Sequence, residues 1–115
     1  MNQYCSLVQL CLCGNQIGLN GCVELGNLLQ KSRLKELDIE YKNDIDDECI
    51  DALIGPLTKH KSLIQLSLSQ NNDITTAGWQ TFSALLRDPN SVLEGLHLSE
   101  TGLDDEGAAV IANAL

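Results

Sequence analysis

A short phrase of aliphatic residues recurs four times along the chain and constrains the fold more than any other feature. Each copy spaces its aliphatic residues three and then two positions apart, and the third copy is followed by Asn71. The four copies are Leu7, Leu10 and Leu12; Leu34, Leu37 and Ile39; Leu63, Leu66 and Leu68; and Leu93, Leu96 and Leu98. They begin at residues 7, 34, 63 and 93, so the periods are 27, 29 and 30 residues. Periods of this length predict a solenoid of stacked repeats.

Each phrase is followed by a pattern typical of an amphipathic helix. In the third repeat, Ile74 begins the pattern, and large apolar residues follow it at 5, 8, 11 and 12 positions. These offsets lie on one face of a helix. The other repeats keep the same offsets with few exceptions, so the sequence predicts one strand and one helix per repeat. Trp79 falls on the apolar face, where packing in the core is favoured over an exposed contact.

The helix boundaries are also predictable. Asp46, Thr75 and Asp104 each follow the first apolar residue of their helix pattern and are good N-cap types. Pro56 lies inside the second helical pattern, where proline removes a backbone hydrogen bond and clashes with the preceding turn. We therefore expect the second helix to end near Ile54.

Composition excludes several classes of function. The chain has 115 residues and a formal net charge of −9, which opposes binding to nucleic acid or to anionic membrane surfaces and favours a basic protein partner. It contains no apolar run long enough to span a membrane and no signal-peptide pattern. Five cysteines form an odd set, which favours reduced thiols. We expect a cytoplasmic protein.

These repeats resemble the leucine-rich repeat family, in its long-repeat, ribonuclease-inhibitor-like class. The resemblance implies an α/β fold: a right-handed solenoid, or horseshoe, of about four repeats. Parallel strands would line its concave face and helices its convex face. We expect one domain over residues 1–115, with repeats at about 5–32, 33–61, 62–91 and 92–115. An asparagine should close each turn, although Asn43 is displaced by one position and Thr101 replaces it in the fourth repeat.

The same resemblance implies a non-catalytic scaffold that binds a protein partner through its concave face and adjoining loops. The alternative is a fragment of a larger regulator, either a nucleotide-binding leucine-rich-repeat receptor or a GTPase-activating protein. Solenoid ends normally carry polar caps. Neither end of this sequence has one, so we expect a fragment or a short uncapped array that self-associates through its ends.

Residues flanking the inward-facing leucines of a strand point to the opposite face of the sheet. This alternation predicts a partner-binding set on the concave face: Glu36, Asp38, Glu40, Tyr41, Gln65, Ser67, Ser69, His97 and Ser99. Three acidic residues in the second repeat would attract a basic segment. The alternative is an ordinary solvated polar surface.

Metal sites and catalysis are not favoured by the sequence. Cys5, Cys11, Cys13 and Cys22 suggest zinc, but Cys11 and Cys13 are closer together than the usual Cys-x2-4-Cys pair. The acidic run at 43–48 lacks the central glycine and closing glutamate of a calcium loop, so we interpret it as helix capping. His97 has serines nearby but no nucleophile turn. We predict no metal, no cofactor and no enzymatic activity.

Overall fold

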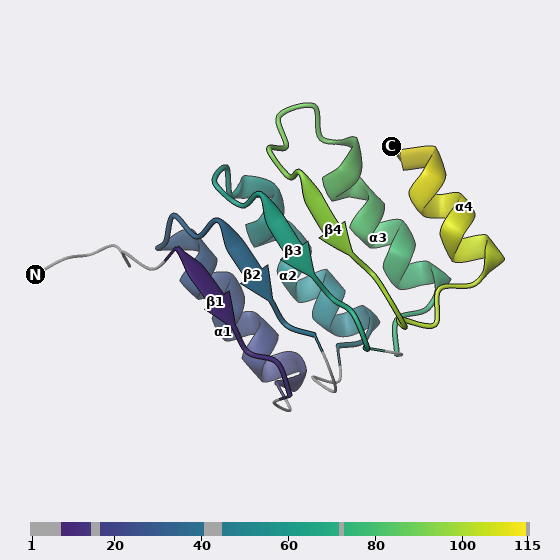
Figure 1. The fold of residues 1–115 in the computed structure, drawn as a ribbon, viewed down its shortest axis with the longest axis horizontal. Helices are drawn as coiled ribbons and strands as arrows, with labels where there is room; N and C mark the ends of the chain where they lie inside the picture. Colours follow the sequence, from purple (N-terminus) through teal and green to yellow (C-terminus); the bar gives the residue numbers. More distant parts are fainter. Residues whose placement is uncertain (1–7, 15–16, 41–44, 72, 115) are drawn as a thin grey trace, which may run out of the picture.

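The computed structural model describes residues 8–14, 17–40, 45–71 and 73–114, and it shows a strand-helix unit repeated four times (Figure 1). The elements in chain order are β1 (Gln9–Cys11), α1 (Gly18–Gln30), β2 (Glu36–Asp38), α2 (Asp47–Lys59), β3 (Gln65–Ser67), α3 (Thr76–Arg87), β4 (Gly95–His97) and α4 (Asp105–Ala114). The strands form one parallel sheet in the order β1-β2-β3-β4. This alternation confirms the predicted α/β solenoid.

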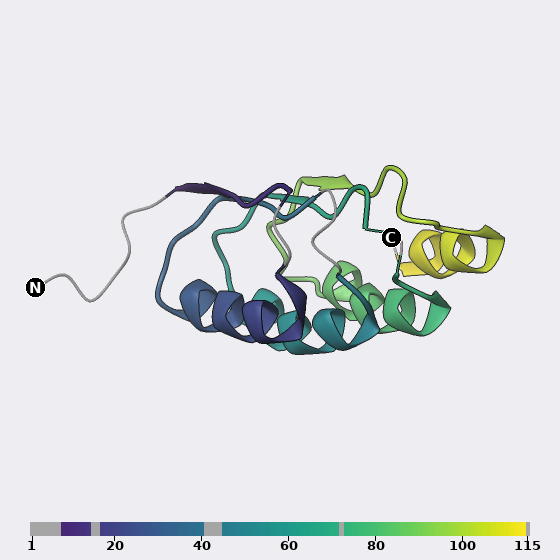
Figure 2. The ribbon, with the colours of Figure 1, turned by 90° about the horizontal axis from the view of Figure 1, so that it is seen from below.

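The sheet and the helices form two layers, with the strands in one and the helices in the other (Figure 2). The central leucine of each strand lies beside that of the next strand, in a row formed by Leu10, Leu37, Leu66 and Leu96. Leu37 and Leu66 are buried, whereas Leu10 and Leu96 at the two ends are only partly buried. The leucine phrase therefore builds the seam between the layers. None of the described helices is both long and apolar enough to cross a membrane.

The helix layer supplies the bulkiest core residues. Trp79 and Phe82 of α3 are buried and meet edge to face, with their ring centroids 6.1 Å apart. This placement confirms the predicted core position of Trp79. Cys22 of α1 and Cys49 of α2 are also buried, and burial is the main cause that raises the pKa of both thiols. They belong to the core and not to a surface site.

Asn71 closes the turn after β3 as predicted. Its side chain is buried, and its Nδ2 donates to the carbonyl oxygens of Ile39 and Leu68, both at 3.0 Å. Its Oδ1 accepts the backbone N–H of Ile45 at 3.4 Å. The residue thus links the second repeat to the third. Asn15 and Asn43 lie outside the described residues.

The helix starts are at the predicted positions, but one is capped differently. The Asp46 side chain accepts the backbone N–H of Cys49 at 3.0 Å, and the Asp104 side chain accepts the backbone N–H of Gly107 at 2.8 Å. Thr75 makes no side-chain cap for α3. Instead, Asp47 of the preceding helix accepts the Thr75 N–H at 2.8 Å and also its hydroxyl. The expected Thr75 cap is therefore replaced by a contact between repeats.

The expectation that α2 ends near Ile54 is wrong. The helix continues through Pro56 to Lys59. Proline inside a helix costs about 3 kcal/mol, but Leu57 beyond it is buried, which contributes about 1.5–3 kcal/mol. The proline ring also packs on α1, where a Cβ at Gly26 would lie 2.9 Å from its Cγ. Packing in the core therefore offsets the local cost of the proline.

Candidate functional site

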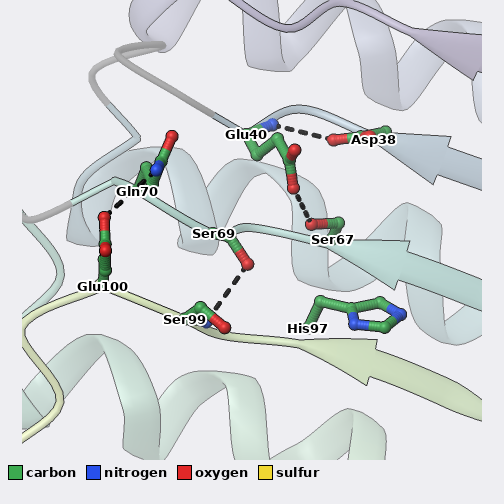
Figure 3. A pocket seen from close by; sticks show the side chains of 8 residues that line it. All are labelled: Asp38, Glu40, Ser67, Ser69, Gln70, His97, Ser99 and Glu100. Carbon is green, nitrogen blue, oxygen red and sulfur yellow. Dashed lines mark hydrogen bonds between the residues drawn. The ribbon is translucent and has the colours of Figure 1, made fainter.

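The side of the sheet turned away from the helices, here called the open face, carries a polar hollow. Its volume is about 460 Å³. Figure 3 shows the eight residues that line it: Asp38, Glu40, Ser67, Ser69, Gln70, His97, Ser99 and Glu100. Six of these are among the predicted partner-binding residues. Glu36 and Gln65 line an adjoining hollow on the same face. The predicted residue Tyr41 lies outside the described residues.

Strand register explains why these residues gather. Asp38 on β2 pairs with Ser67 on β3, which pairs with His97 on β4. The side chains two positions onward, Glu40 and Ser69, project on the same side because successive strand residues alternate between faces. A repeated sequence pattern thus becomes two parallel rows of polar side chains.

Hydrogen bonds hold the floor of the hollow in place. The Ser67 hydroxyl donates to Oε2 of Glu40 at 2.6 Å, and the Glu40 N–H donates to Oδ1 of Asp38 at 3.2 Å. The Ser69 hydroxyl accepts the Ser99 N–H at 3.1 Å. Ser67 and Ser69 are each only 7% exposed. These two serines therefore offer little surface themselves and mainly connect neighbouring repeats and orient an acidic side chain.

Two residues that the strand alternation predicts at the rim, just beyond the partner-binding set, also line the hollow. Gln70 and Glu100 have φ values of 64° and 57°, in the left-handed region that side-chain-bearing residues rarely adopt. Gly14 has a φ of 77° at the equivalent turn of the first repeat. Gln70 Nε2 donates to Glu100 Oε2 at 3.1 Å, so the two turns are joined at the rim.

His97 is exposed on this face. Within the described part of the chain, its Nε2 lies 3.4 Å from Oε1 of Gln65 and hydrogen-bonds to no serine. The arrangement therefore provides no contact between a nucleophile and a base among these residues. Chemically, the face presents carboxylates, an amide and an imidazole, which are suited to binding and not to acyl transfer.

A second cluster lies at the edge of the open face. Cys11 and Cys13 from the first repeat meet Asp38 from the second, and the three potential ligand atoms all lie within 4.8 Å of one another. Sequence reasoning considered only the spacing between cysteines. It missed Asp38 because that residue reaches the thiols only through the pairing of β1 with β2.

No family model matches the chain. The chain is 31% identical over 102 residues to protein phosphatase 1 regulatory subunit 37 of Danio rerio, covering 89% of this chain and 11% of that protein. It is 30% identical over 102 residues to the Homo sapiens protein of the same name, covering 89% and 14%. It is also 34% identical over 112 residues to NACHT, LRR and PYD domains-containing protein 14 of Homo sapiens, covering 96% and 10%.

The chain thus spans about a tenth to a seventh of the length of these relatives. Their names describe a regulatory subunit and a protein with an LRR region. These names agree with the prediction that the chain is not an enzyme.

Proposed function

Because this chain is a leucine-rich repeat protein, we propose that it is a protein-binding module whose open face binds a basic segment of a partner protein. The supporting observation is the gathering of Asp38, Glu40 and Glu100 around one hollow, with Glu36 in the adjoining one. Contacts between repeats hold two of these side chains before binding, because Glu40 accepts the Ser67 hydroxyl and Glu100 accepts the Gln70 amide. Little conformational entropy is then lost when the partner binds.

A regulatory role within a larger assembly is the second part of the proposal. The chain is similar to a protein named as a regulatory subunit of protein phosphatase 1, so we propose the catalytic subunit of that phosphatase as the first partner to test. The four repeats would act as one binding domain in the cytoplasm. The alternative is that they are one segment of a receptor of the NACHT and LRR type, which similarity to such proteins supports.

The test compares partner binding by the parent chain and by a variant in which three acidic residues of the open face are replaced by amides of the same size. Glu36→Gln, Asp38→Asn and Glu40→Gln are combined, because amides keep the size of the side chains. The immobilised proteins are titrated with purified protein phosphatase 1, and partners captured from a cell lysate are quantified alongside. We expect at least about tenfold weaker binding by the variant, because removing charges from an interface removes electrostatic complementarity.

A matched control removes the same number of charges from the helix side. Glu24→Gln, Glu48→Gln and Asp51→Asn change exposed residues of α1 and α2. Equal weakening by the control would show that only net charge matters, and unchanged binding by the open-face variant would move the site to the loops or helices. Thermal unfolding of each variant establishes that it is folded.

The two ends of the solenoid support a further proposal, self-association. An apolar hollow at the first repeat is lined by Leu10, Leu12, Ile17 and Leu28, and a second at the fourth repeat includes Leu96 and Ile111. In head-to-tail stacking, the first repeat of one copy would contact the fourth repeat of another, so both hollows at that junction would be covered. Sedimentation of the parent over a range of concentrations should show oligomers, and Leu28→Gln should reduce them. Val23→Gln, on the exposed surface of α1, is the control. A monomer at every concentration would contradict the proposal.

A further inference from the structure

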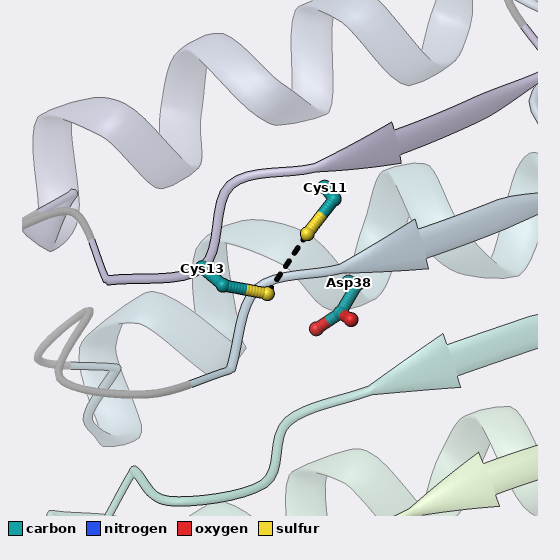
Figure 4. A group of neighbouring side chains, drawn as sticks. All are labelled: Cys11, Cys13 and Asp38. Atoms are coloured by element: carbon teal, nitrogen blue, oxygen red, sulfur yellow. Dashed lines mark hydrogen bonds between the residues drawn. The ribbon is translucent and has the colours of Figure 1, made fainter.

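Two cysteines and an aspartate converge at the edge of the open face, as Figure 4 shows. Cys11 ends β1 and Cys13 lies two residues later, so both side chains project on the same side of the chain. Their Sγ atoms are 2.9 Å apart. Asp38 is the β2 partner of Cys11 in the sheet register. Three potential metal ligands therefore come together from two neighbouring repeats.

The backbone holds this cluster in place. The N–H of Leu12, which lies between the two cysteines, donates to the carbonyl oxygen of Asp38 at 2.8 Å. Asp38 itself is fixed on its other side, because its Oδ1 accepts the Glu40 N–H at 3.2 Å. The convergence is thus a consequence of the strand pairing and not of one flexible side chain.

The dimensions suit a single cation. Zinc binds thiolate sulfur at about 2.3 Å and carboxylate oxygen at about 2.0–2.2 Å, so two sulfur ligands of a tetrahedral ion lie roughly 3.8 Å apart. The three ligand atoms lie within 4.8 Å of one another. The sulfurs need to separate by only about 1 Å to admit the ion, which rotation of the exposed Cys11 side chain can supply. Three protein ligands leave the fourth position of a tetrahedral ion for water or another ligand.

Charge around the cluster favours a cation. A divalent cation stabilises two thiolates and a carboxylate that lie close together. Glu36 of β2 and Glu40, two residues beyond it, flank Asp38 in the sequence and add to the local negative charge.

We propose that Cys11, Cys13 and Asp38 form a binding site for a thiophilic divalent cation of the zinc class. Sulfur ligands select such ions over Mg²⁺ and Ca²⁺, which prefer oxygen. Binding forms two metal–sulfur bonds and one metal–oxygen bond, and the two thiol protons leave to solvent. The charge of the site is therefore unchanged on loading. The ion would join the first repeat to the second and leave one position open for water or for a ligand from a partner.

Cobalt is the probe, because thiolate-bound Co²⁺ absorbs in the near ultraviolet whereas Zn²⁺ is silent. The reduced full chain is titrated with Co²⁺, then with Zn²⁺ as competitor, and proton release is measured in weak buffer. We expect one Co²⁺ per chain with thiolate charge-transfer absorption, displacement by Zn²⁺ and about two protons released per ion. The midpoint of thermal unfolding should rise with Zn²⁺ concentration, because the ion binds the folded chain.

The variants assign the ligands. Cys11→Ser and Cys13→Ser should each abolish the charge-transfer absorption, and Asp38→Asn should weaken Co²⁺ binding by at least about tenfold. Glu36→Gln removes one charge from the same strand without removing a ligand, so it should bind Co²⁺ within about twofold of the parent. Cys5→Ser is the control for the thiol that precedes β1, and it should also behave as the parent.

Two outcomes would overturn the assignment. One is the absence of charge-transfer absorption when the reduced parent chain is titrated with Co²⁺. If peroxide treatment of that chain also joins Cys11 and Cys13 in a disulfide, the pair is a redox couple instead of a metal site. The other is loss of binding in Cys5→Ser together with retention in Cys11→Ser, which would place the ion elsewhere. Cys11→Ser and Cys13→Ser remove metal ligands but no acidic side chain of the open face, so failure of the metal site is distinguishable from failure of the partner-binding proposal.

Discussion

Replacing Asn71 with alanine is expected to lower the free energy of unfolding by about 3 kcal/mol. The side chain is 2% exposed and donates at 3.0 Å to both Ile39 and Leu68. Longer contacts of 3.4 Å reach the Ser69 oxygen and the Ile45 N–H. The two shorter bonds account for about 2 kcal/mol, at about 1 kcal/mol each. The buried backbone groups left behind add about 1 kcal/mol more.

The fourth repeat provides an internal comparison. Thr101 occupies the equivalent position and is also buried, but its hydroxyl makes one hydrogen bond, to the Leu98 oxygen at 2.8 Å. Thr101→Ala should therefore cost only about 1 kcal/mol. Asn71→Thr should fall between the two alanine variants, because a hydroxyl can replace one donor contact but not the bridge between repeats.

The assay is urea-induced unfolding followed by far-ultraviolet circular dichroism, with equal m-values required for the comparison of free energies. Asn113→Ala is the matched control, since Asn113 is exposed on α4. The reasoning is refuted if Asn71→Ala is no more destabilising than Asn113→Ala. It is also refuted if Thr101→Ala costs as much as Asn71→Ala, because the bridge between repeats would then contribute nothing.

Three further predictions concern contacts between repeats and the open face. Gly26→Ala should lower the free energy of unfolding in urea by about 1–3 kcal/mol, because the new Cβ would lie 2.9 Å from Pro56 Cγ. Adding Pro56→Ala should recover part of that loss. If the two substitutions have additive effects on the free energy of unfolding, this explanation is wrong. His60 is held neutral by burial, which lowers its pKa from 6.5, and its Nδ1 accepts the Leu63 N–H at 3.1 Å. As the pH is lowered below 6.5, the unfolded chain takes up a proton on His60 more readily than the folded chain does. The free energy of unfolding should therefore decrease as the pH is lowered, and it should decrease less in His60→Gln. An equal pH dependence of stability in the two proteins would refute the role of the imidazole. Partner binding should weaken as salt is raised from about 0.05 to 0.5 M, and the neutralised open-face variant should lose most of that dependence in the same titration.

The arrangement of strands and helices could be predicted from the sequence by itself. Leu37 and Leu66 lie in the row that their spacing predicts, and Trp79 lies in the core. This success has a physical reason: each unit of a solenoid contacts only its neighbours, so a local pattern repeated in register is enough to build the whole. The alternation of strand side chains likewise placed Asp38 and His97 on the open face.

Only the tertiary structure decided which side chains meet between repeats. Glu40 accepts the hydroxyl of Ser67, 27 residues away, and Asp47 accepts the backbone N–H of Thr75, 28 residues away. Asp38 reaches the cysteine pair in the same manner, through the pairing of β1 with β2. These contacts depend on distances of a few ångströms and on side-chain rotamers, which a pattern of residue types does not specify.

Pro56 shows, within one helix, the difference between what the local sequence determines and what packing determines. Its local preference predicts that the helix ends, yet α2 continues to Lys59 because Leu57 is buried beyond it and the proline ring packs against Gly26. Local sequence thus determined the number, kind and order of the elements. Packing between neighbouring repeats determined where this helix ends and which polar groups share a site, because the free energy of those choices comes from partners about one repeat away in the sequence.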